Sequence, residues 1–311
     1  MLSRRSVRIK VMQLLYMLNR DEHLAFEGLV KDYNEGIWKT YELYIFQLYL
    51  LLRVTQYAEK DAAHRATKML PSDEDKIFQP RLYANPCTQS LANHVDFLNV
   101  VAKYKANENV DEDHVRSLYL AFAETPEYKT YLALTEPTNE THVKLLLELY
   151  RFLTNHDLFV DMSEDRYNNW PDDESLVVGA MKKTLKTMPF QGAFFKEHEP
   201  NDETVREFGE ELLRKTCQED RALFAYIEPM LKNWDADRVA ILDMIMIKMA
   251  LCELLHFPTI PTKVTLNEFV EISKVYSTDK SKDFINGILD RLMKKLVREE
   301  KIVKEGRGLI E

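Results

Sequence analysis

Residues 235–256 read DADRVAILDMIMIKMALCELLH, and this stretch decides the class of fold. Drawn as a helix, it carries apolar side chains on nearly every face: Val239, Ile241, Leu242, Ile245, Met246, Ile247 and Met249. A helix that is apolar all round is one that other helices surround. We therefore expect a long buried helix here, with the neighbouring segments packed around it.

The opening of the chain has the pattern of an amphipathic helix. Ser3 is a suitable N-cap, and one apolar stripe then recurs at helical spacing: Val7, Val11, Leu14, Leu15 and Leu18. Arg5, Arg8, Met12 and Tyr16 fall on a neighbouring stripe, so we expect them at the edge of the buried face.

Helical periodicity extends over much of the remaining chain. The spacing predicts helices at about 37–69, 91–105, 112–123, 141–155, 174–187, 204–217, 219–232, 265–276 and 282–304. Thr265 and Glu268 have the spacing of a capping box, and residues 71–75, 107–113 and 171–174 are polar breaks. No alternating strand pattern stands out, so the sequence predicts an all-α, irregular helical bundle.

Composition narrows the class of protein further. The chain has 311 residues, of which 45% are hydrophobic and 30% charged, which is a soluble globular balance. Only eight glycines occur, too few for the phosphate-binding loops and tight hairpins that depend on this residue. Cys87, Cys217 and Cys252 lack metal-site spacing, and no signal-peptide or membrane-spanning run is present. We expect a cytoplasmic protein with no membrane association.

The formal net charge of −9 argues against nucleic acid as a partner. The distribution of charge changes this view. Residues 1–10 hold four basic residues and no acid, and residues 263–311 hold eleven basic residues against nine acidic ones. The excess acid therefore belongs to the long middle of the chain, and both ends are basic.

Signatures of catalysis are missing from the sequence. It contains no HExxH, GxSxG, P-loop or dinucleotide fingerprint, and GRG at 306–308 lacks a third glycine and a following helix. The eight histidines are scattered singly along the chain. For His142 and His256 we therefore favour a structural role, with the ring hydrogen-bonded in the fold, over a role as metal ligand. We expect no enzymatic activity, no cofactor and no metal.

Two basic segments suggest RNA. Three arginines lie near the N-terminus of the first predicted helix, where the helix dipole disfavours positive charge. Either these side chains are simply solvated, or they are there to bind phosphate groups. In STDKSKDFINGILD (277–290), Lys280 and Lys282 precede Phe284, which lies off the apolar stripe of the last helix. Phe284 could pack against the preceding loop, or it could stack on RNA bases beside phosphate-binding lysines.

Four segments resemble the NusB family of transcription antitermination factors. They are SRRSVRIKVMQLLY (3–16), NWDADRVAILDMIMIKMALCELL (233–255), IPTKVTLNEFVEISKVYS (260–277) and DFINGILDRL (283–292), in the family's order. The chain departs from the family in three respects. Family members are less than half as long as this chain, and they often have an arginine at the position of Ser6. They frequently have Tyr at the position of Cys252 and Arg at that of Lys248.

The resemblance implies a non-enzymatic factor that binds boxA-type single-stranded leader RNA of ribosomal RNA operons. The implied protein partners are the ribosomal protein NusE and the RNA polymerase elongation complex. By position, the implied RNA contacts are Arg4, Arg5, Arg8, Lys280, Ser281, Lys282, Phe284 and Asn286. Tyr16 and Asp243 fall at positions that the family uses against NusE.

The polar segment KEHEPNDET (196–204) is the best candidate for a domain boundary. We expect residues 1–20 with 204–300 to form the NusB-like RNA-binding domain, residues 21–203 an acidic helical insertion, and 301–311 a tail. Two rival hypotheses remain. One is a protein-interaction scaffold that has lost specific RNA binding, and the other is an RNA-modifying enzyme that carries a NusB-like module.

Overall fold

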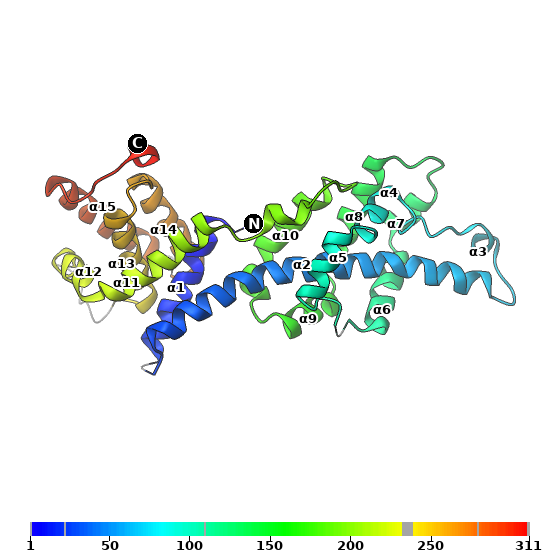
Figure 1. Cartoon of the computed structure of the whole chain (residues 1–311), viewed down its shortest axis with the longest axis horizontal. Coiled ribbons are helices and arrows are strands. Elements are labelled where there is room, and N and C mark those ends of the chain that lie inside the picture. The colour runs from blue at the N-terminus through cyan, green and yellow to red at the C-terminus, as the bar shows by residue number, and fades with distance from the viewer. Residues whose placement is uncertain (1, 22, 109, 232–238, 279, 310–311) are drawn as a thin grey trace. The chain divides into compact units, whose positions relative to one another are not determined.

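The computed structural model describes residues 2–21, 23–108, 110–231, 239–278 and 280–309 (Figure 1). Within those ranges the regular structure is helical and contains no strand, which confirms the all-α prediction. The chain forms two compact units, which we call the terminal unit (Leu2–Ile37 with Pro200–Glu311) and the middle unit (Trp38–Glu199). The predicted division into an RNA-binding domain, an insertion and a tail is a functional one and stays a prediction.

The terminal unit gathers helices from both ends of the sequence. Its elements are α1 (Arg4–Arg20), the start of α2 (Phe26–Ala66), the π-helical η2 (Glu203–Glu210), α11 (Glu211–Gln218), α12 (Asp220–Ile227), the 3₁₀ turn η3 (Glu228–Met230), α13 (Ile241–His256), α14 (Thr262–Tyr276), α15 (Ser281–Arg298) and the 3₁₀ turn η5 (Gly306–Leu309). In Figure 1, α1 in dark blue lies beside α11, α13 and α14 of the C-terminal part.

The centre of the terminal unit is α13, as its all-apolar pattern predicts. Met246, Ile247, Met249 and Leu251 are completely buried there, and α1, α11, α12, α14 and α15 all pack against this helix. The predicted start of the helix at residues 235–238 lies outside the described residues. One charged side chain, Glu253, is also completely buried in α13.

In its described residues, 38–108 and 110–199, the middle unit contains the rest of α2, eight shorter α-helices and one 3₁₀ turn. These are α3 (Asp73–Ile77), α4 (Pro86–Ala92), α5 (Val95–Lys103), α6 (Glu112–Ala123), α7 (Pro126–Leu132), α8 (Asn139–Thr154), α9 (Asp157–Arg166), α10 (Trp170–Leu185) and η1 (Phe194–His198). Its core is rich in aromatic side chains, and buried polar groups pair within it. For example, the Tyr150 hydroxyl donates to Gln47 Oε1 at 2.5 Å.

Several predicted boundaries need correction. The expected helix or pair of helices at 37–69 is one helix, α2, that begins at Phe26 and ends at Ala66. The predicted break at 71–75 overlaps the start of α3. The expected capping box of Thr265 and Glu268 is wrong, because α14 already begins at Thr262 and Thr265 is buried inside it. Arg8 and Met12 were expected at the edge of the buried face, but both are fully buried, since η2 and α14 also cover α1.

Candidate nucleic-acid interface

The arginines at the start of α1 are positioned by a well-formed helix N-terminus. The Ser3 side chain accepts a hydrogen bond from the backbone N–H of Ser6, which confirms the predicted N-cap. Val7 and Val11 are completely buried against the core, and this fixes the rotation of the helix. The three arginine side chains therefore leave the helix in defined and different directions.

Arg8 points into the core of the terminal unit. Its Nε and Nη2 atoms each donate to a carboxylate oxygen of Glu253 at 2.7 Å, and both side chains are almost completely buried. The Thr265 hydroxyl donates to Glu253 Oε1 at 2.6 Å, and the Arg8 guanidinium lies 4.9 Å from the centre of the Phe208 ring. The burial of Arg8 in this network supports a structural role for it, and direct RNA contact stays a prediction.

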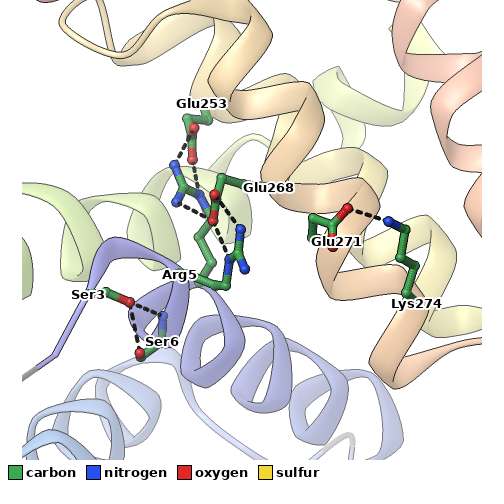
Figure 2. Close-up of polar contacts among 8 residues, drawn as sticks. Ser3, Arg5, Ser6, Glu253, Glu268, Glu271 and Lys274 are labelled. Carbon is green, nitrogen blue, oxygen red and sulfur yellow. Dashed lines mark hydrogen bonds and ion pairs between the residues drawn. The ribbon is translucent and has the colours of Figure 1, made fainter. Parts of the chain in front are cut away.

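Arg5 also reaches toward α14, but its side chain stays half exposed. It donates from Nε and Nη2 to the two oxygens of Glu268 at 2.8 and 2.7 Å, as Figure 2 shows. These hydrogen bonds lower the pKa of the Glu268 carboxyl, so the carboxylate stays ionised at neutral pH. Arg8 Nη1 also lies 3.7 Å from Glu268, so this one carboxylate links the buried and the exposed arginine.

An open hollow of about 790 Å³ lies at this end of α1. Its lining combines α1 with the loop before α14 and the start of that helix: Ser3, Arg4, Arg5, Arg8, Thr259, Ile260, Pro261, Lys263, Val264 and Glu268. Arg4 is partly exposed and donates to Glu203 at 3.1 Å, while Lys263 is exposed. The hollow therefore offers two guanidinium groups and an ammonium group to an anionic partner.

The second basic segment does not line this hollow. Lys280, Lys282, Phe284 and Asn286 lie at the start of α15, where Lys280 and Asn286 are exposed and Lys282 and Phe284 are partly so. Ser281 is buried, and its hydroxyl lies 2.8 Å from that of Ser277 and 2.9 Å from that of Thr278. RNA contact by these five residues stays a prediction.

The two residues expected to face NusE differ in exposure. Tyr16 is exposed on α1, but Asp243 is buried and accepts a hydrogen bond from the Ser277 hydroxyl at 2.5 Å. This bond ties α13 to the turn before α15. A partner role for Asp243 stays a prediction, and the structure shows what the carboxylate does within the fold.

Sequence reasoning missed the carboxylates that hold the arginines. Glu253 is an acid in the C-terminal half of a largely apolar helix, and this was the signal that could have identified it as the counter-charge of a buried base. Glu268 was assigned to a capping box, and Lys263 was not singled out. Among the described residues, no group of three or more His, Cys, Asp or Glu side chains could hold a metal ion. No helix in the same part of the chain is long and apolar enough to cross a membrane.

The terminal unit is thus an all-α unit with arginine side chains around an open hollow. A sequence model of the NusB family matches residues 176–294. The chain is 38% identical over 109 residues to the transcription antitermination protein NusB of Salinibacter ruber, covering 35% of this chain and 68% of that protein. The chain belongs to the NusB family.

Two further relatives bear the same name. The protein of Chloroherpeton thalassium is 34% identical over 110 residues, covering 35% of this chain and 52% of the relative. That of Natranaerobius thermophilus is 45% identical over 71 residues, covering 23% and 51%. The aligned part thus spans only about half of these two relatives. No solved structure matches the chain. The family match begins within α10, so the resemblance of residues 3–16 to the family's first helix lies outside it.

Proposed function

We propose that this chain is a non-catalytic transcription antitermination factor. Its terminal unit binds boxA-type single-stranded leader RNA of ribosomal RNA operons, together with the ribosomal protein NusE. The bound pair then supports processive transcription by the RNA polymerase elongation complex. Membership of the NusB family, and the antitermination role that its relatives' names state, support this proposal.

The observation that carries the RNA part is the contrast between Arg5 and Arg8. The buried Arg8–Glu253 pair anchors the start of α1, while Arg5, three residues earlier, holds its guanidinium half exposed at the hollow. A guanidinium held in one orientation can bind a phosphate through two parallel hydrogen bonds. In this proposal Arg4, Arg5 and Lys263 neutralise phosphates, and Arg8 positions the helix that carries two of them.

The start of α15 provides the second contact in the proposal. Lys280 and Lys282 add positive charge, while the partly exposed Phe284 ring stacks on a splayed base. Asn286, exposed one turn from Lys282, hydrogen-bonds the edge of a base. NusE binds near Tyr16, and its own RNA contacts raise the affinity of the complex, which is a linkage between two partners.

The test is a salt titration of RNA binding by the full chain. We expect the double variant Arg4→Ala, Arg5→Ala to weaken binding of a boxA-type RNA. It should also flatten the dependence of log K on log salt by about 1.4, since each phosphate contact contributes about 0.7 for a single strand. The control is Lys31→Ala with Lys294→Ala, which removes two exposed charges that do not line the hollow. An unchanged slope in the arginine variant would reject these contacts.

The rival scaffold hypothesis has one observation in its favour. Arg4, Arg5 and Arg8 each have a carboxylate partner, so ion pairing alone would explain the arginines at the start of α1. A gel shift with boxA-type RNA, with and without NusE, separates the two hypotheses. A scaffold binds NusE without binding the RNA in either condition.

A further inference from the structure

The segment after α15 folds back onto the loop between α13 and α14. Lys304 Nζ donates to the carbonyl oxygen of Phe257 at 3.0 Å, and the backbone N–H of Glu305 donates to the carbonyl oxygen of Pro258 at 3.0 Å. The 3₁₀ turn η5 follows directly. Two consecutive carbonyl groups of the loop are therefore held by two consecutive residues of this segment.

A close backbone contact at Gly308 adds to these hydrogen bonds. A Cβ atom at this position would lie 1.9 Å from the carbonyl oxygen of Pro258, so any larger residue would push the segment away from the loop. Gly306 has a φ of +53°, a backbone conformation that favours glycine. In the GRG stretch, Gly308 thus allows a close backbone contact and Gly306 a left-handed backbone conformation.

Lys304 is suited to its place at the end of a helix. Phe257 is the C-cap of α13, and a cation beside the last carbonyls of a helix is favoured by the helix dipole. Burial lowers the pKa of Lys304, and the negative charge of Glu253 opposes that shift. Lys304 is itself only partly buried, and its ammonium group is held by the Phe257 carbonyl.

The loop held in this way forms a wall of the hollow. Thr259, Ile260 and Pro261 directly follow the two clamped residues and line the hollow together with Arg4 and Arg5. Ile260 is buried, and its N–H donates to the same Phe257 carbonyl that Lys304 reaches. A displacement at Phe257 or Pro258 is consequently transmitted to the surface that faces the arginines.

We propose that residues 304–308 form a clasp that positions the 257–261 wall for RNA, with Lys304 and Gly308 as positioning residues. This inference rests on the proposed function of the hollow. A preformed wall spares the RNA complex the cost of ordering the loop on binding. Loss of the clasp therefore lowers RNA affinity without removing any phosphate contact.

The test uses Lys304→Met and Gly308→Val in the full chain. We expect each variant to weaken binding of boxA-type RNA about tenfold, to leave the salt slope unchanged and to speed hydrogen exchange at residues 257–263. Lys304→Arg, which keeps a cation on the Phe257 carbonyl, should restore most of the affinity. Lys294→Met and Gly287→Ala are matched controls, since Lys294 is exposed and nothing lies within 4 Å of an added Cβ at Gly287.

Three results would overturn the clasp. Faster exchange at 257–263 with unchanged affinity would show that the wall does not matter for RNA, and unchanged exchange in both variants would show that the segment does not hold the loop. A flatter salt slope in Lys304→Met would make Lys304 a phosphate contact. Two other results would reject the proposed function, and the clasp with it. One is that Arg4→Ala, Arg5→Ala leaves RNA binding and its salt slope unchanged, and the other is that the unmodified chain does not bind the RNA.

Discussion

Arg8 and Glu253 are 245 residues apart in the chain and form a two-point ion pair in the interior of the terminal unit. Their side chains are 2% and 0% exposed. The pair is further satisfied by the Thr265 hydroxyl, so helices α1, α13 and α14 meet at one carboxylate. A buried ion pair adds little net stability over an apolar pair, but it strongly penalises any arrangement that separates the charges. It thus fixes the position of α1 on α13.

The first prediction concerns this pair. Arg8→Met leaves Glu253 as an uncompensated buried charge, so we expect the free energy of unfolding to fall by about 3–5 kcal/mol. Arg8→Met combined with Glu253→Leu should recover most of this loss, because both charges are then gone. Denaturant unfolding of the four proteins of the double-mutant cycle provides the measurement. Arg4→Met, which removes the exposed pair with Glu203, is the control and should cost less than about 1 kcal/mol.

The second prediction concerns Glu268. This carboxylate occupies both donors of Arg5 that a phosphate would use, so it competes with RNA for the same guanidinium. We expect Glu268→Gln to strengthen RNA binding at low salt by up to about fivefold, the equivalent of about 1 kcal/mol for a partly exposed ion pair. The salt dependence should become steeper. Weaker binding would show that Glu268 mainly orients Arg5. Glu35→Gln, which removes an exposed pair with Lys31, is the control.

The third prediction is a pH dependence in the middle unit. His198 is 4% exposed, its Nε2 lies 3.0 Å from the Thr184 hydroxyl, and burial lowers its pKa from 6.5 to about 4. Below pH 6.5 the unfolded chain therefore binds a proton that the folded chain does not, so stability falls as the pH drops toward 4. The loss has a ceiling of about 3 kcal/mol.

Denaturant unfolding from neutral pH down to about 4.5 measures this effect. His198→Gln should lose stability at neutral pH but show a flatter decline on acidification. His114→Gln, at an exposed histidine, should decline as the unmodified chain does. An equal decline in the His198 variant would assign the acid sensitivity to other groups.

The fourth prediction concerns a close contact at Gly209. An added Cβ would lie 1.9 Å from the hydroxyl oxygen of Tyr33 and 2.3 Å from a methyl group of Val7. The Tyr33 hydroxyl donates to the Val205 carbonyl at 2.9 Å, so Gly209→Ala both crowds the core and disturbs a buried hydrogen bond. We expect a loss of about 2–4 kcal/mol in unfolding free energy. Gly287→Ala, in open space on α15, should be neutral or slightly stabilising.

The periodicity of apolar residues predicted individual helices well where one face is buried. The stripe of α15 is an example, because Ile285, Ile288, Leu289 and Leu292 are all buried as expected. It failed where an additional element covers a helix. Met12 and Arg8 lie beside the main stripe of α1, and both are buried because η2, α11, α13 and α14 all pack against this helix. The predicted start of α14 was wrong for a similar reason. Thr265 is a residue type that can cap a helix, but its hydroxyl donates a hydrogen bond to the buried Glu253 carboxylate inside the helix.

The sequence by itself determined the all-α class, the buried central helix and the likeness to the NusB family, because these depend on local spacing and on short motifs. Only the tertiary structure decided what each arginine does. Arg5 and Arg8 are the same residue type on the same helix, and nothing local distinguishes their roles. The distinction comes from Glu253 and Glu268, which reach α1 from 245 and 263 residues away and leave one guanidinium buried and the other half exposed. Charge pairing between distant segments depends on how the helices pack, and periodicity along one helix does not contain that information.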